Sequence, residues 1–264
     1  MKITVFFLPA LLLCAFQFAD TTHTRALESL ANAERNFSAT SEAKGLHQAF
    51  VENMAEDGIV FAPKPTNGRK LHAAAPASKA LLTWYPAYAD ISSSLDWGYT
   101  TGPYQLKANP EAEEIAGAGF YLSVWRRQPD GQWKVTVDMG NSFPAELLKD
   151  EVYRPAKATA KGKKAKGTAE GLLSRDVQNV QPYIAETLIY RHGQYPYKYK
   201  EAAIEPAANV VYTNLGHELS PAADMAYTYG SYSQAGESGH YLKVWKMMGG
   251  EWKLVAHNLV PDRR

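Results

Sequence analysis

Three segments of this chain occur twice, in the same order along the sequence. The paired segments are GYTTGPY (98–104) with AYTYGSY (226–232), GFYLSVWR (119–126) with GHYLKVWK (239–246), and GQWKV (131–135) with GEWKL (250–254). A repeat in fixed order indicates one structural unit that is used more than once. The length of 264 residues allows one or two domains, since domains commonly have about 100–200 residues. The repeat therefore predicts two domains of one fold.

The composition argues against several classes of protein. The net charge is +1, and the sequence has no basic stripe, glycine-rich phosphate loop or serine nucleophile elbow, so nucleic-acid binding and the commonest nucleotide and hydrolase functions are disfavoured. Cys14 is the one cysteine and lies in the N-terminal apolar segment, which leaves no disulfide and no thiolate metal site. The histidines, among them His47 and His72, show no metal-ligand spacing. We expect no metal and no cofactor.

The first residues have the pattern of a secretory signal. Lys2 precedes the apolar stretch 3–18, and Asp20 ends it. A positive start before an apolar stretch too short to span a membrane is typical of an export signal. We expect cleavage after Ala19, no stable membrane insertion afterwards, and a periplasmic or secreted location in a bacterium. Lipidation at Cys14 and an uncleaved anchor are the alternatives.

The first copy, residues 20–148, is predicted to contain helices followed by antiparallel strands. Hydrophobic spacing predicts helices at 25–40, 43–55 and 74–84, a strand at 59–63, and further strands at 88–93, 97–106, 119–128 and 132–139. This order predicts an α+β domain, with helices packed on one face of a curved antiparallel sheet.

The second copy, residues 171–264, is predicted to be a shortened version of the first. It follows a Lys/Ala/Gly linker at 149–170, which we interpret as solvated because blocks of like charge usually stay disordered. The predicted elements are one helix at 172–185, a strand LIYR (188–191) matching IVFA (59–62), a helix at 200–209, and the closing strands.

These segments carry a resemblance to a known superfamily. A helix ending in AEDG, the strand IVFAP, and then YTTGPY, GFYLSVWRR and PDGQWKVTVD resemble the SnoaL-like branch of the nuclear transport factor 2-like superfamily. The resemblance covers residues 27–140 well and 172–261 more loosely. It implies two tandem cone-shaped domains, each a curved sheet wrapped over helices with a pocket at the wide end. Members include ketosteroid isomerases, dehydratases, cyclases and non-catalytic binding modules, so the fold alone does not give the function.

The ketosteroid isomerase pattern is not kept at its general base. In that family an Asp precedes the Pro of the motif that AEDGIVFAP resembles, but here Ala62 stands at that position. Arg191 is the matching residue of the second copy. Because proton transfer needs a titratable group at the reacting carbon, the resemblance disfavours steroid-isomerase chemistry at this position.

Asp138 is the next candidate for a catalytic acid–base residue. Two-residue periodicity places Trp133, Val135, Val137 and Met139 on one face of the last strand of the first copy. The apolar set is expected to face the helices, which leaves Asp138 on the open face near Lys134. The second copy has His257 at the matching position. The alternative to catalysis is a solvated or paired carboxylate.

A group of aromatic residues is predicted to bind a small apolar or aromatic ligand near the mouth of the first cone. The group consists of Phe61, Trp84, Tyr85, Tyr88, Tyr99, Tyr104 and Tyr121. Aromatic rings line many concave sites, and phenols can orient a carbonyl or hydroxyl group. The alternative is that the rings fill the core. Two tryptophans of the first copy, Trp125 and Trp133, recur in the second as Trp245 and Trp252, and all four are predicted to be core or domain-contact residues.

Three functions remain open from the sequence. The leading hypothesis is a protein that binds a small ligand in its first domain, while the second domain is a structural partner. The second is an isomerase, dehydratase or cyclase with Asp138 or a tyrosine as the acid–base group. The third is a protein-interaction module. Since many cones of this superfamily pair through their sheets, the two copies are expected to pair within one chain and give a monomer.

Overall fold

The structure is a computed structural model that describes residues 10–157, 166–178, 180–192, 195–198 and 209–262. The start of the predicted signal, three lysines of the linker (Lys161, Lys163 and Lys164) and residues 200–208 of a predicted helix lie outside the described residues. None of the helices in the described part combines the length and the apolarity needed to cross a membrane.

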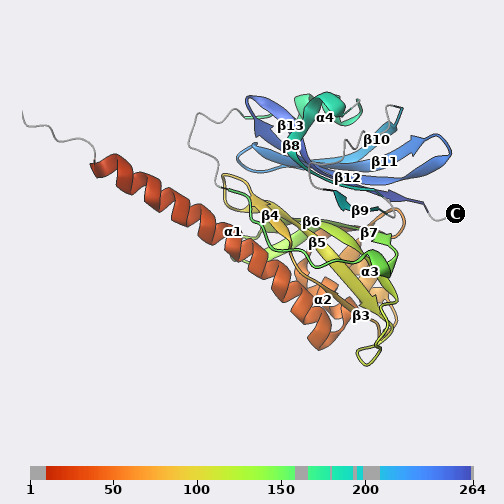
Figure 1. Cartoon of the computed structure of the whole chain (residues 1–264). Helices are drawn as coiled ribbons and strands as arrows, with labels where there is room; N and C mark the ends of the chain where they lie inside the picture. The colour runs from red at the N-terminus through yellow and green to blue at the C-terminus, as the bar shows by residue number, and fades with distance from the viewer. Residues whose placement is uncertain (1–9, 158–165, 179, 193–194, 199–208, 263–264) are drawn as a thin grey trace, which may run out of the picture.

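The described residues form two sheets with helices on their outer faces (Figure 1). The elements of the first half are α1 (Ala10–Lys44), α2 (Leu46–Asn53), β1 (Met54–Phe61), β2 (Pro65–Asn67), α3 (Gly68–Ala74), β3 (Leu81–Trp84), β4 (Tyr88–Ile91), β5 (Trp97–Lys107), β6 (Gly117–Arg127), β7 (Trp133–Phe143) and the 3-10 helix η1 (Ala145–Leu147). Those of the second half are α4 (Ala169–Asp176), the 3-10 helix η2 (Gln181–Tyr183), β8 (Ile184–His192), β9 (Tyr195–Lys198), β10 (Val211–Leu219), β11 (Met225–Gln234), β12 (Glu237–Met248) and β13 (Glu251–Pro261).

The two sheets have the same order of strands. The first sheet runs β2-β1-β7-β6-β5-β3, with β4 also paired to β5, and the second runs β9-β8-β13-β12-β11-β10. In each sheet the first long strand lies parallel to the last, β1 to β7 and β8 to β13, and the other pairs are antiparallel. The mixed α+β architecture predicted from the sequence is confirmed, with β10 standing where the first half has both β3 and β4.

Two predicted helices differ from the structure. The segment 74–84 is not a helix, because α3 begins one residue after Asn67, whose side chain accepts a hydrogen bond from the Lys70 amide, and ends before Pro76. Leu81–Trp84 forms β3 instead. The predicted helix 172–185 stops at Asp176, and the chain re-enters a sheet at Ile184 after Pro182.

The pairing register also corrects the alignment of the first strands of the two copies. Ile59 lies opposite Val137, and Ile189 lies opposite the equivalent Ala256. Ile189 is therefore the counterpart of Ile59, one residue away from the match predicted between LIYR and IVFA. Arg191, which was predicted to match Ala62, is instead the counterpart of Phe61, and its side chain is not among those described.

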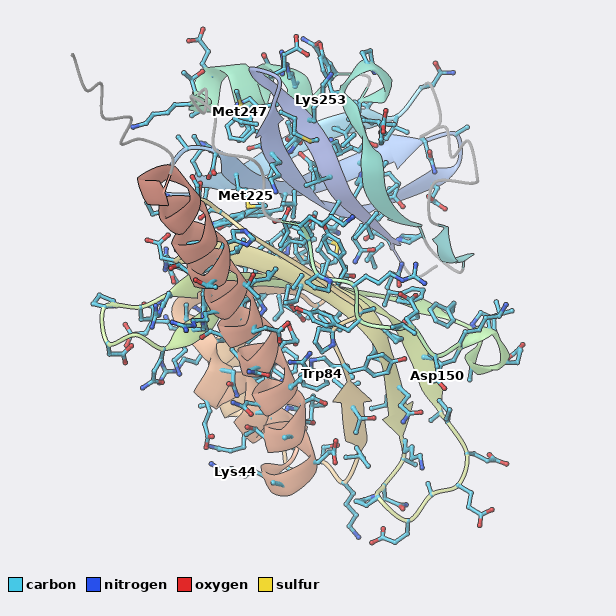
Figure 2. The ribbon with its side chains drawn as sticks, turned by 60° about the vertical axis from the view of Figure 1, so that its left-hand side comes forward. Lys44, Trp84, Asp150, Met225, Met247 and Lys253 are labelled. Carbon is cyan, nitrogen blue, oxygen red and sulfur yellow. The ribbon has the colours of Figure 1, made fainter. Side chains whose placement is uncertain are left out.

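The two sheets pack face to face through one apolar cluster. It contains residues of the first sheet (Trp97, Tyr99, Leu122, Val124, Val137 and Met139) and of the second (Ala185, Ile189, Met225, Tyr227, Leu242, Val244, Val255 and Ala256). Figure 2 shows Met225 at the level where the sheets meet, whereas Trp84 lies on the α1 side of the first sheet. The Asn258 side-chain amide donates to the Met139 carbonyl at 2.8 Å across this contact.

Ion pairs at the edges of this contact are reciprocal. Arg126 of β6 pairs with Glu218 of β10 at 3.3 Å, and Lys246 of β12 pairs with Asp90 of β4 at 2.7 Å. Arg126 and Lys246 occupy the same position of the repeat, and Asp90 and Glu218 lie opposite the equivalent tyrosines of β5 and β11. Each half thus presents the same patch to the other, as the subunits of a two-fold symmetric dimer do.

Candidate functional site

A β-bulge in β7 turns Asp138 towards the helices. Trp125 lies opposite Val135 while the adjacent Val124 lies opposite Val137, so Thr136 is an extra residue in β7. The side-chain alternation shifts at such a bulge. Val135 packs in the cluster under α1, whereas Val137 packs between the sheets. The sequence-based prediction that Asp138 lies on the open face, with all four apolar neighbours towards the helices, was therefore wrong.

Asp138 lies directly opposite Ser123 on β6, whose hydroxyl donates a hydrogen bond to its carboxylate at 2.6 Å. The side chain is partly buried. Burial disfavours the charged form and raises the pKa of Asp138 to about 6, against the opposing effect of the Ser123 hydrogen bond. A carboxyl group with this pKa can change its protonation state near neutral pH.

Glu34 is a second buried carboxyl group on the same side of the sheet. It belongs to α1 and is fully buried. Its carboxylate accepts hydrogen bonds from the Trp84 indole at 2.5 Å, the Trp125 indole at 3.0 Å and the Thr100 hydroxyl. Burial outweighs these hydrogen bonds and raises the pKa of Glu34 to about 7, and the nearby Asp138 raises it further.

The sequence contained a signal for Glu34 that the sequence analysis did not use. Leu27, Leu30, Ala31 and Phe37 form the buried stripe of α1. Glu34 stands seven residues after Leu27, in the middle of that stripe. A charged residue at a stripe position is unusual and indicates a buried, hydrogen-bonded carboxyl group. Glu34 and Asp138 together are called the carboxyl pair below.

The structure does not bring the seven predicted aromatic residues together. Trp84, Tyr85 and Tyr104 line a cavity of about 230 Å³, whose other lining residues are Glu42, Thr83, Pro103, Gln105, Leu148 and Asp150. Tyr121 is buried in the cluster under α1. The remaining three, Phe61, Tyr88 and Tyr99, pack in or against the cluster between the sheets. Trp84 lines this cavity, and its indole N–H donates to Glu34 of the carboxyl pair.

The second sheet carries an equivalent but different group on its own helix side. Asp176, at the end of α4, is fully buried and accepts hydrogen bonds from Thr228 at 2.6 Å and Tyr241 at 2.5 Å. Thr228 is the counterpart of Thr100, and in both halves this threonine accepts from a repeated tryptophan, Trp245 or Trp125. Asp176 therefore takes the role that Glu34 has in the first half.

Two positions of this group differ in charge between the halves. Lys243 stands at the position of Ser123, and His257 stands at the position of Asp138. Lys243 is fully buried and forms an ion pair with Asp176 at 3.2 Å. Burial lowers the pKa of Lys243, and the Asp176 carboxylate opposes that effect. Lys243 thus occupies the interior of the second half and neutralises Asp176 there.

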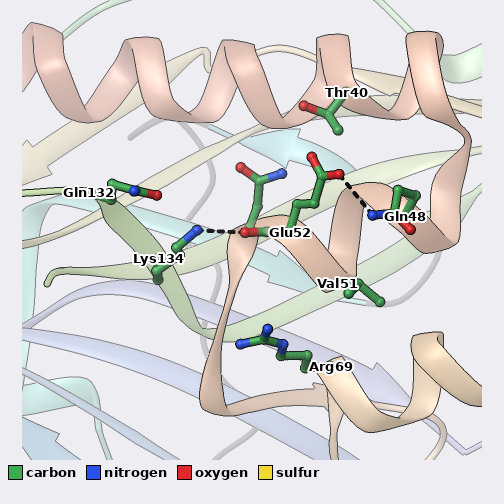
Figure 3. A pocket seen from close by; sticks show the side chains of 8 residues that line it. Thr40, Gln48, Val51, Glu52, Arg69, Gln132 and Lys134 are labelled. Atoms are coloured by element: carbon green, nitrogen blue, oxygen red, sulfur yellow. Dashed lines mark hydrogen bonds between the residues drawn. The ribbon is translucent and has the colours of Figure 1, made fainter. Parts of the chain in front are cut away.

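A polar hollow of about 540 Å³ lies at the end of α2 (Figure 3). It is lined by Thr40, Gln48, Val51, Glu52, Asn53, Arg69, Gln132 and Lys134. Its charges serve the local structure: Lys134 donates to the backbone carbonyl of Glu52 at 2.6 Å, and the Glu52 carboxylate accepts from Gln48 and Lys44. We therefore treat the carboxyl pair, rather than this hollow, as the candidate site.

The histidines give no metal site in the described residues, where no three His, Cys, Asp or Glu side chains lie close enough to hold an ion. His47 and His72 do come together, with their Nδ1 atoms 2.9 Å apart. Burial lowers the pKa of His72 to about 4, and the neighbouring His47 lowers it further. The hydrogen bond between the two rings joins α2 to α3.

No family model and no curated protein matches this chain. Among solved structures, the chain is similar over part of its length to an NTF-2-like protein of unknown function from Shewanella oneidensis (15% identity, 43% of this chain and 96% of that one, TM-score 0.36). It is also similar to a putative ketosteroid isomerase from Parabacteroides distasonis (17%, 42% and 86%, 0.33). A third is a protein of unknown function with a cystatin-like fold from Nostoc punctiforme (15%, 44% and 90%, 0.35). TM-scores of this size identify neither a family nor a function.

Proposed function

We propose that the first half binds a small, largely apolar ligand on the helix side of its sheet, and that the second half is its structural partner. The observation that carries the proposal is the difference between two otherwise equivalent interiors. In the first half the interior holds a partly exposed carboxyl group beside Ser123, whereas in the second Lys243 fills that place. Concave, largely apolar sites with a few polar groups are typical of small-molecule binding.

Four of the predicted aromatic residues support this proposal. Trp84, Tyr85 and Tyr104 offer ring surfaces at the cavity of about 230 Å³, and Tyr121 lies on the inner face two residues from Ser123. The ligand would contact these rings and reach the carboxyl pair past Trp84.

Native mass spectrometry of the protein recovered from its own host tests ligand binding. We expect a small molecule that leaves on gentle activation. Ser123→Leu, which fills the interior with an apolar side chain, should be recovered without it, and circular dichroism would show that the variant is folded. Protein that is empty in several independent preparations would contradict the proposal and favour an interaction module.

The second candidate function is an enzyme of the isomerase, dehydratase or cyclase type, with Asp138 as the acid–base residue. The raised pKa of about 6 favours it, because a base with that pKa is ionised at neutral pH and still accepts a proton well. Incubation of the protein with the recovered ligand should then give an isomer or a product lacking water. Asp138→Asn should abolish conversion while retaining ligand, and conversion that survives this change would exclude Asp138 as the base.

We also propose that the chain is an exported tandem of two nuclear transport factor 2-like domains and a monomer. The equal strand orders and the reciprocal ion pairs support the tandem, and the contact between the sheets covers the face through which a single cone would pair. Cell fractionation with N-terminal sequencing tests export and cleavage after Ala19. A stable homodimer in sedimentation would contradict the monomer.

A further inference from the structure

The buried lysine of the second half shows how this interior holds an ammonium group. The Lys243 Nζ lies 3.4 Å from the centroid of the Tyr212 ring and 4.4 Å from that of Tyr241. It donates hydrogen bonds to the Asp176 carboxylate at 3.2 Å and to the Asp176 carbonyl at 2.6 Å. Aromatic faces together with a carboxylate form a strong site for a desolvated cation.

The first half has counterparts of both aromatic residues, but not of the lysine. Trp84 is the counterpart of Tyr212, because each lies opposite the tyrosine that ends the first repeated segment, Tyr104 or Tyr232. Tyr121 is likewise the counterpart of Tyr241, since both occupy one position of the repeat.

Because the first half has Ser123 where the second has Lys243, its interior has no lysine ammonium group at this position. Ser123 is shorter by the whole aminoalkyl end of that side chain. The first half also has two carboxyl groups, Glu34 and Asp138, where the second has one and a histidine. Neither member of the carboxyl pair has an ion-pair partner in the part of the chain that the structure describes.

We propose that the ligand of the first half is a primary amine on an apolar body, and that its ammonium group takes the place that the Lys243 ammonium has in the second half. This inference rests on the proposed ligand-binding function and adds that the ligand is positively charged. Two carboxylates would replace the carboxylate and carbonyl of Asp176, and Trp84 and Tyr121 would supply the ring faces. The cavity beyond Trp84 has room for the apolar body.

Proton release should accompany binding. The pKa of Asp138 is raised to about 6 and that of Glu34 to about 7, so both are partly protonated below neutral pH. An ammonium ion favours the ionised carboxylates, so amine affinity should rise between pH 5 and pH 8 and a neutral ligand should not follow that curve.

Calorimetric titration of the full chain with 2-phenylethylamine and its neutral isostere 2-phenylethanol tests the inference at pH 7.5. We expect the amine to bind at least about tenfold more tightly than the alcohol, a preference of about 1.4 kcal/mol. Ser123→Lys, which supplies an internal ammonium, and Asp138→Asn should each remove that preference. Ser174→Lys, which adds a lysine on the exposed side of α4, should keep it.

Equal affinity for the amine and the alcohol in the wild type would overturn the inference on charge while leaving ligand binding intact. Binding of neither compound, together with protein that is recovered empty, would overturn the proposed function as well. An amine preference that persists in both Ser123→Lys and Asp138→Asn would place the amine elsewhere and also overturn the inference.

The second half allows an independent test by chemical rescue. Lys243→Ala removes the atoms that n-propylamine contains, so the amine should raise the melting temperature of this variant more than that of the wild type, and n-propanol should not. If n-propylamine stabilises the variant no more than n-propanol does, this interior does not recognise ammonium groups and the inference fails.

Discussion

The interiors of the two halves share a scaffold and differ in their charge. In both, a carboxylate from a helix accepts a hydrogen bond from a threonine, which itself accepts from a tryptophan of the repeat: the carboxylate is Glu34 in the first half and Asp176 in the second. In the second half Lys243 neutralises this carboxylate. In the first, Ser123 does not, and Asp138 adds a further acid. Two halves with the same strand order can thus keep a common core while substitutions at two facing strand positions place a buried ion pair in one interior and a second carboxyl group in the other.

The largest expected effect follows from breaking the ion pair that closes the second half. Lys243→Met keeps most of the side-chain volume but leaves the fully buried Asp176 without its cation. Removal of one partner of a buried pair costs about 3–5 kcal/mol. We expect urea unfolding to show a loss of this size in the free energy of unfolding.

The double variant Lys243→Met with Asp176→Asn should recover part of this loss, because no buried charge is left unpaired. Lys253→Met removes a lysine that is paired with the exposed Glu251 two residues before it on β13, and it should change stability by about 0.5 kcal/mol or less. If Lys243→Met lowered the free energy of unfolding no more than this control does, the ion pair between Lys243 and Asp176 would not stabilise the second half.

The first half should respond to pH through Glu34. Its pKa is about 7 in the folded protein, against an ordinary value of 4.5, so folding favours the neutral carboxyl group. The stability from this group is fully present below pH 4.5 and is lost as the pH rises to 7. The shift corresponds to about 3 kcal/mol. The prediction is tested by comparing the free energy of urea unfolding of the wild type with that of Glu34→Gln at pH 4.5, 5.5, 6.5 and 7.5.

The difference in stability between wild type and Glu34→Gln should fall across that range and then level off. Glu34→Gln keeps the shape and carries no titrating group, so the comparison removes the effect of other carboxyl groups. A difference that increased with pH would mean that the hydrogen bonds from Trp84, Thr100 and Trp125 outweigh burial. Glu34 would then be a permanently ionised structural carboxylate.

The repeat predicted the sheets much better than it predicted the polar site. The long strands, such as β5 and β6, lie within about two residues of their predicted bounds, because periodicity and turns are local signals. The direction of Asp138 depends on one extra residue in β7, which changes the side-chain alternation without leaving a turn signal. The partners of Glu34 come from β3, β5 and β6, and only the fold brings them to one carboxylate.

The smallest expected effect concerns the reciprocal ion pairs between the halves. Lys246 and Asp90 have side chains that are 15% and 4% exposed, whereas those of Arg126 and Glu218 are 34% and 26% exposed. Because a buried acid left unpaired costs more than a solvated one, Lys246→Met should lower stability by about 2 kcal/mol and Arg126→Met by less than about 1 kcal/mol. Urea unfolding at low and high salt measures both, and salt should reduce chiefly the smaller effect. Equal losses would mean that the two ion pairs are equivalent in energy as well as in sequence position.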